Sequence, residues 1–74
     1  MWNHRVVRKN HEDETWLGIH EVFYDAKGIP HMVTVDPVEV CGETLEELEE
    51  TLNWMLKALG QPILEYDDIP PGGE

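Results

Sequence analysis

The clearest structural signal in the chain is a single capped, amphipathic helix. Thr44 and Glu47 form the T-x-x-E pattern of a capping box, in which a threonine hydroxyl accepts a hydrogen bond from the amide three residues later. Lys57 places a cation in the last turn, and Gly60 is positioned to end the helix in a left-handed conformation. These signals predict one helix over residues 45–59.

The helix has one apolar face when it is plotted at 100° per residue. The residues on this face are Leu45, Leu48, Leu52, Met55, Leu56 and Leu59. Most of the acidic side chains fall on the other side, so we expect them to be the solvated surface of a helix whose leucines pack on a sheet. Trp54 lies nearly opposite the apolar face, beside Ala58. We interpret it as an anchor for a partner, with cover by the tail as the alternative.

Three segments rich in β-branched and aromatic residues precede the helix, and each is expected to form a strand. The turn DAKG between the second and third segments suits a type I turn with Gly28 left-handed, which would pair Tyr24 with Ile29. A further short strand is possible at 63–66. The three predicted strands cover residues 2–9, 15–25 and 29–35.

This order predicts an α+β fold in which a three-stranded antiparallel meander packs on one α-helix, βββα, with the optional fourth strand. We expect one domain over residues 1–69 and a disordered tail over 70–74. A chain of 74 residues buries a marginal core, and Cys41, the single cysteine, cannot form an intramolecular disulfide. Stability is therefore expected to need a metal or a partner chain.

Both faces of the predicted sheet are apolar, and one helix covers one face. We therefore expect a second chain, the same protein or a different one, to cover the remaining apolar surface. The surface predicted to bind this partner comprises Leu17, Ile19, Phe23, Met32, Glu47, Glu50, Trp54 and Ala58.

The net charge of −11 argues against some partners. An acidic chain repels phosphate backbones and anionic lipid surfaces, so neither direct nucleic-acid binding nor membrane binding is expected. A basic protein remains a possible partner. With one cysteine and no apolar run long enough for a signal peptide or a membrane span, we expect a reduced bacterial cytoplasm.

Three histidines offer an alternative chemistry. If Arg8 lies opposite Trp16, His4 faces His20, and His31 lies nearby on the third strand. Three imidazoles on one sheet face suit zinc, although their spacing matches no short metal motif. Buried or surface histidines are commoner than ligands, so we expect neither a metal nor a cofactor. The sequence also lacks the phosphate-binding, dinucleotide-binding and C-x-x-C motifs, and an enzyme is not expected.

The strand segments followed by CGETLEEL resemble the N-terminal part of HicB-type antitoxins, in which three strands lead into a G-x-[ST]-x-E-E motif that opens a helix. The resemblance covers residues 4–60 and rests on Gly42, Thr44, Glu46, Glu47 and Leu48. It implies a partial RNase-H-like βββαβ fold, toxin binding and dimerisation. The 74 residues contain no DNA-binding module of that family, so autorepression is not expected. The stretch IHEVFYDAKG is more closely similar to short uncharacterised bacterial proteins with an H-E-V-[FY]-Y-D sequence.

Together these features predict a small, acidic, non-enzymatic interaction protein of the cytoplasm that forms a homodimer, and the resemblance to HicB-type antitoxins implies an antitoxin-like role. Two alternatives remain open. The first is an acidic mimic that occupies the nucleic-acid site of a basic enzyme, with Glu46, Glu47, Glu49 and Glu50 in place of phosphates. The second is a metal-binding protein that uses the three histidines.

Overall fold

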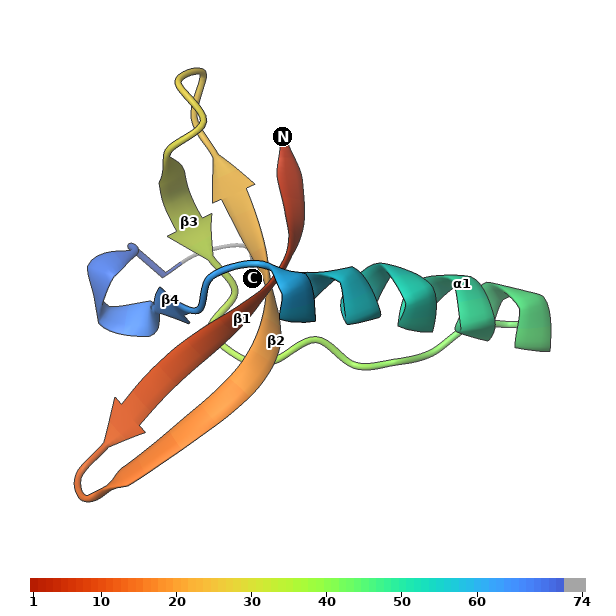
Figure 1. The fold of residues 1–74 in the computed structure, drawn as a ribbon, viewed down its shortest axis with the longest axis horizontal. Coiled ribbons are helices and arrows are strands. Elements are labelled where there is room, and N and C mark those ends of the chain that lie inside the picture. The colour runs from red at the N-terminus through yellow and green to blue at the C-terminus, as the bar shows by residue number, and fades with distance from the viewer. Residues whose placement is uncertain (72–74) are drawn as a thin grey trace.

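The computed structural model describes residues 1–71 of the chain, and it is an α+β fold with one α-helix. Figure 1 shows the strands crossing at the centre of the molecule, with the helix extending away from them. The coarse fold class predicted from the sequence is therefore confirmed. The elements are β1 (Trp2–His11), β2 (Glu14–Tyr24), β3 (Pro30–Val33), α1 (Leu45–Lys57), the 3-10 helix η1 (Ala58–Gly60), β4 (Leu64–Glu65) and the 3-10 helix η2 (Tyr66–Asp68).

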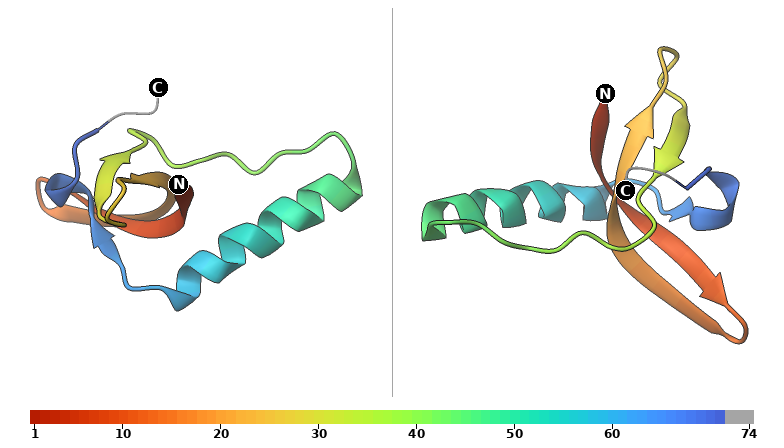
Figure 2. Two further views of the ribbon diagram at one scale, coloured as in Figure 1. Left: turned by 90° about the horizontal axis from the view of Figure 1, so that it is seen from above. Right: turned by 180° about the vertical axis from the view of Figure 1, so that it is seen from behind.

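The sheet has four strands in the order β3-β2-β1-β4. β1 pairs antiparallel with β2, and β2 pairs antiparallel with β3. β4 lies parallel to β1 on its other edge, so the sheet is mixed, whereas we expected an antiparallel three-stranded meander with an optional fourth strand. The strands twist strongly, as the two views in Figure 2 show.

The pairing of β1 with β2 differs by one residue from the predicted register. Arg8 lies opposite Leu17 and not opposite Trp16, because a two-residue turn at Glu12 and Asp13 joins the strands. Glu12 adopts a positive φ of 54° there. A slip of one residue moves every side chain of a strand to the other face. The predicted neighbours across this pair are therefore wrong.

The pairing of β2 with β3 keeps the predicted faces but not the predicted partners. Phe23 lies opposite Met32, and Tyr24 lies opposite Pro30 after an irregularity between Phe23 and Tyr24. Gly28 is left-handed as expected, with a φ of 79°. Since the observed and predicted registers differ by an even number of residues at Phe23, this side chain still shares a face with Met32, as predicted.

The carboxylate of Asp25 closes this hairpin. Its Oδ1 accepts hydrogen bonds from the backbone amides of Lys27 at 2.8 Å and of Ile29 at 3.0 Å. These two amides, with that of Ile29 contributing most, lower the pKa of the Asp25 carboxyl below its ordinary value. The side chain thereby shapes a loop that is longer than the tight turn predicted.

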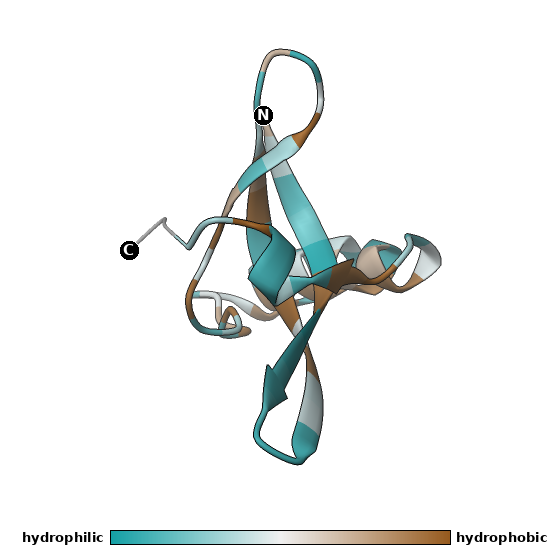
Figure 3. Cartoon of the chain, turned by 90° about the vertical axis from the view of Figure 1, so that its left-hand side faces the viewer, coloured by the Kyte–Doolittle hydropathy of each residue, from teal (hydrophilic) through white to brown (hydrophobic). Residues whose placement is uncertain are grey.

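A cluster of buried hydrophobic residues lies on one face of the sheet. Val7, Val22 and Val33 come from three neighbouring strands, and Ile69 covers them from the C-terminal segment. Tyr24, Leu64 and Tyr66 pack around this cluster. The β1/β2 hairpin is hydrophilic at its far end and becomes hydrophobic towards the centre of the sheet, as Figure 3 shows.

The C-terminal segment continues along β3 beyond the predicted domain boundary. The backbone amide of Val33 donates to the carbonyl of Pro70 at 3.1 Å, and Val33 also forms a bridge with Pro71. Residues 70 and 71, which we placed in a disordered tail, are thus paired with the sheet. The rest of that predicted tail, 72–74, lies outside the described residues.

The start of α1 follows the sequence prediction closely. The Thr44 hydroxyl accepts from the amide of Glu47 at 3.1 Å, and the Glu47 carboxylate accepts from the amide of Glu43 at 3.1 Å. A Cβ at Gly42 would lie 2.9 Å from the amide nitrogen of Leu48, so glycine permits this close approach of the chain to the helix.

The end of α1 differs from the prediction. After Lys57 the helix tightens into the 3-10 turn η1, and the amide of Gln61 donates to the carbonyl of Ala58 at 3.2 Å. Within the described residues the left-handed glycine is Gly28, so the predicted left-handed stop at Gly60 is wrong.

The predicted packing of α1 on the sheet is also wrong. The connection over 34–44 is extended and runs out beside the helix, so that α1 meets the sheet only near its C-terminal end, where it and η1 contact β1 (Figures 1 and 2). Of the six apolar residues assigned to the packed face, Met55 is buried and Leu48 is half-buried. The other four are exposed.

Candidate functional site: the exposed face of helix α1

Four leucines of α1 and η1 form an apolar surface that the chain leaves uncovered. We call this surface the leucine face. Successive members are separated by seven, four and three residues, which is the spacing of one side of a helix. Their exposed fractions are 80% for Leu45, 49% for Leu52, 62% for Leu56 and 64% for Leu59. The most exposed of them, Leu45, is the first residue of α1, and this end of the helix lies away from the sheet (Figure 1).

The protein's own sheet covers a neighbouring side of the same helix. Met55 and Ala58 are 5% and 1% exposed, and both belong to the part of the helix that contacts β1. The helix plot predicted that Ala58 lies on an outward surface beside Trp54. The structure shows instead that Ala58 is buried, so this part of the prediction is wrong. The helix therefore packs against the chain through Met55 and Ala58, and the leucine face beside them remains exposed.

Charge is distributed unevenly along α1. The four acidic residues all lie in its first half, and all are exposed. They are Glu46, Glu47, Glu49 and Glu50. From Thr51 to the end of η1 there is no acid, and Lys57 is an exposed cation. The helix thus has an acidic first half and a neutral to basic second half.

Trp54 lies at a hollow between the C-terminal half of α1 and the start of β1. The hollow has a volume of about 510 Å³ and is lined by Trp2, Asn3, His4, Trp54, Lys57 and Gln61. Trp2 and His4 meet edge to face, with ring centroids 5.3 Å apart. Trp54 is 53% exposed, so the described part of the C-terminal segment leaves much of this side chain accessible.

The predicted sheet surface is partly accessible. Leu17 is 57% exposed, near the far end of the β1/β2 hairpin. Ile19, Phe23 and Met32 are half-buried. These four residues share the face opposite the Val7 core, because strand residues alternate between faces.

The structure does not bring the three candidate histidines together. His4 lies opposite Glu21 on one face of the sheet, while His20 lies opposite Arg5 on the other. The His20 ring is 1% exposed, and its Nδ1 lies 2.9 Å from the carbonyl oxygen of Thr34, to which it can donate. Among the described residues, no three His, Cys, Asp or Glu side chains cluster as a metal site would require.

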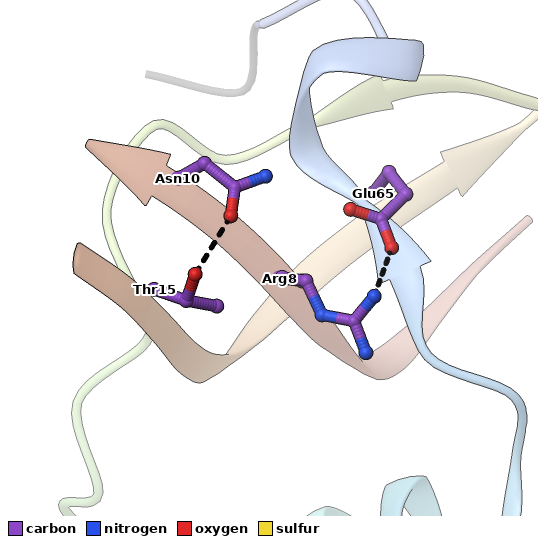
Figure 4. A network of polar contacts seen from close by, with 4 residues as sticks. All are labelled: Arg8, Asn10, Thr15 and Glu65. Atoms are coloured by element: carbon purple, nitrogen blue, oxygen red, sulfur yellow. Dashed lines mark hydrogen bonds and ion pairs between the residues drawn. The ribbon is translucent and has the colours of Figure 1, made fainter. Parts of the chain in front are cut away.

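The basic residues of β1 are engaged within the fold. Arg8 forms an ion pair with Glu65 at 2.7 Å and holds β4 to β1 (Figure 4). Arg5 donates to the Tyr24 hydroxyl at 3.1 Å. Lys9 donates to a backbone carbonyl of the 34–44 connection and lies 4.4 Å from the ring centre of Tyr66. These three cations therefore have partners within the fold.

A polar contact also fixes the exposed end of the β1/β2 hairpin. The Thr15 hydroxyl donates to the side-chain oxygen of Asn10 at 2.9 Å, across the two strands (Figure 4).

Cys41, on the connection before α1, is exposed and is not in a disulfide.

Comparison of the chain with family models, with curated proteins and with solved structures gives no match. Within residues 1–71, no helix combines the length and the apolar character that crossing a membrane requires. The exposed surfaces of the protein are therefore the basis for a proposal about its function.

The predicted packing of the leucine face is wrong. The periodicity correctly indicates that its four leucines are aligned on one side of the helix, but we expected them to pack on the sheet. The hollow beside Trp54 was also missed on the strand side, because Trp2 and His4 carry no local signal that links them to a helix fifty residues later.

Proposed function

We propose that this protein is a non-enzymatic protein-interaction module that works as a homodimer through the leucine face of α1. The observation that carries the proposal is a helix that extends from the sheet with four aligned leucines about half or more exposed. Soluble monomers rarely leave aligned apolar surfaces of this kind uncovered. A second protein chain is the simplest cover.

The energy available from this surface is comparable to the cost of association. The four exposed fractions amount to about two and a half whole leucines, and covering them stabilises a complex by roughly 4–8 kcal/mol per chain. Two such faces supply roughly twice that, against an association cost of about 4–15 kcal/mol. The gain from covering the two faces is therefore of the same order as the cost of association.

Size-exclusion chromatography with light scattering tests the proposal. The chain has a mass of 8.6 kDa, so a dimer has about twice this mass. We expect the dimer mass at tens of micromolar and a decrease towards 8.6 kDa on dilution. A monomer at every concentration up to the millimolar range would refute the homodimer.

The element order gives some support to the antitoxin-like form of this proposal. Three strands, a helix and a short fourth strand follow one another, which is the βββαβ order that the resemblance to HicB-type antitoxins implies. The Thr44 cap lies at the position of the shared motif. Toxin binding is then the role to test, by measuring whether the purified protein forms a complex with a purified toxin from a system that contains a HicB-type antitoxin.

The acidic mimic is the second proposal, because all four glutamates of the first half of α1 are exposed on the protruding helix. Binding of a basic nucleic-acid enzyme through these residues is expected to weaken steeply as salt is raised. Equal affinity at low and high salt would exclude the mimic and leave the apolar interaction unaffected.

A further inference from the structure

The leucine face and the charge distribution of α1 together define how two copies fit. We propose that the leucine faces of two chains pack antiparallel around a two-fold axis at Leu52, so that Leu45 of each copy meets Leu59 of the other. This inference rests on the proposed homodimer and goes further by fixing the direction and register of the helices.

Charge favours the antiparallel direction. In a parallel pair the acidic first halves of the two helices, which carry Glu46, Glu47, Glu49 and Glu50, would lie side by side. In an antiparallel pair each acidic half lies beside a half with no acid and with Lys57. Like charges on adjacent helices repel, and opposite charges attract. The opposed macrodipoles of antiparallel helices act in the same direction.

Spacing fixes the register. Leu52 lies seven residues after Leu45 and seven before Leu59, so it is the midpoint of the face. A two-fold interface brings a central residue against its own copy and exchanges the residues on either side. Placing the axis at Leu52 covers all four leucines of both chains, whereas any other register leaves an end leucine exposed.

The shape of the molecule agrees with this direction. The sheet lies at the C-terminal end of α1, and the start of the helix projects away from it (Figures 1 and 2). In an antiparallel pair the partner's sheet lies next to this projecting end, where Leu45 is 80% exposed. In a parallel pair both sheets would have to occupy the same end of the helix pair, and Leu45 would gain no such cover.

Cysteine cross-linking of the full chain tests the geometry. The variants are made in a Cys41→Ser background, since Cys41 is exposed and would react. The single variants are Leu45→Cys, Leu52→Cys and Leu59→Cys, all at exposed positions of α1 and η1. A disulfide forms only where the two Cα atoms approach within about 7 Å. In the proposed pair two copies of residue 45 lie about 20 Å apart, given a rise of about 1.5 Å per residue.

We expect Leu52→Cys to oxidise to a linked dimer, and Leu45→Cys and Leu59→Cys to do so only when mixed with each other. A size tag on one of the mixed proteins identifies the mixed dimer. Efficient linking of Leu45→Cys with itself would overturn the antiparallel direction. A dimer by light scattering without linking of Leu52→Cys would overturn the register and leave the homodimer intact. A monomer at all concentrations would overturn both proposals.

Discussion

Shortening Leu52 is the most direct perturbation of the proposed dimer. Alanine is the best helix former, so Leu52→Ala removes apolar surface without weakening α1. Leu52 is 49% exposed in the single chain, so about half of its side chain remains to be covered by a partner.

The expected effect follows from this exposure. Leucine to alanine deletes three carbons, each contributing about 0.8 kcal/mol when fully covered. With half of the side chain covered by the partner, the loss is about 1 kcal/mol per chain and about 2 kcal/mol for the two-fold pair. Because 1.4 kcal/mol corresponds to a factor of ten, the dimer Kd is expected to rise about 30-fold.

Sedimentation equilibrium over a range of concentrations measures this Kd, and Leu17→Ala is the matched control. Leu17 is a leucine of similar exposure, 57%, but it lies on the β1/β2 hairpin. We expect Leu17→Ala to leave the Kd unchanged. The reasoning fails if Leu52→Ala leaves the Kd unchanged, or if Leu17→Ala weakens the dimer as much, which would point to the sheet surface as the interface.

Three further changes test the fold that presents this surface. Thr44→Ala removes the acceptor for the Glu47 amide, costs α1 about 1 kcal/mol, and should speed hydrogen exchange in α1 without affecting the core. His20→Leu leaves the buried Thr34 carbonyl without its donor, and urea unfolding should show a loss of about 1–3 kcal/mol. The pKa of the Asp25 carboxyl is lowered below its ordinary value of 3.8, so its ionised form stabilises the folded protein at neutral pH, and this stabilisation is lost as the pH falls through the lowered pKa. The difference in urea midpoint between the protein and Asp25→Ala should therefore shrink in acid.

Much of the local structure could be predicted because its determinants are close in sequence. The Thr44–Glu47 cap and the left-handed Gly28 depend on residues within one turn of each other, and both are found. The register of β1 with β2 could not be predicted in the same way. It depends on a two-residue turn in which Glu12 takes a positive φ, and glutamate is not a residue that signals this conformation.

The helix shows where sequence reasoning reaches its limit in this protein. An apolar face at helical spacing indicates that something must cover it, and the same pattern results whether the cover is the chain's own sheet or another molecule. Here the extended 34–44 connection positions the helix so that Met55 and Ala58 pack against the chain and Leu45 and Leu52 do not. The acids confined to the first half of α1 then carry information that periodicity lacks. A uniformly charged helix would leave the direction of pairing open, whereas this one favours a partner that runs the opposite way.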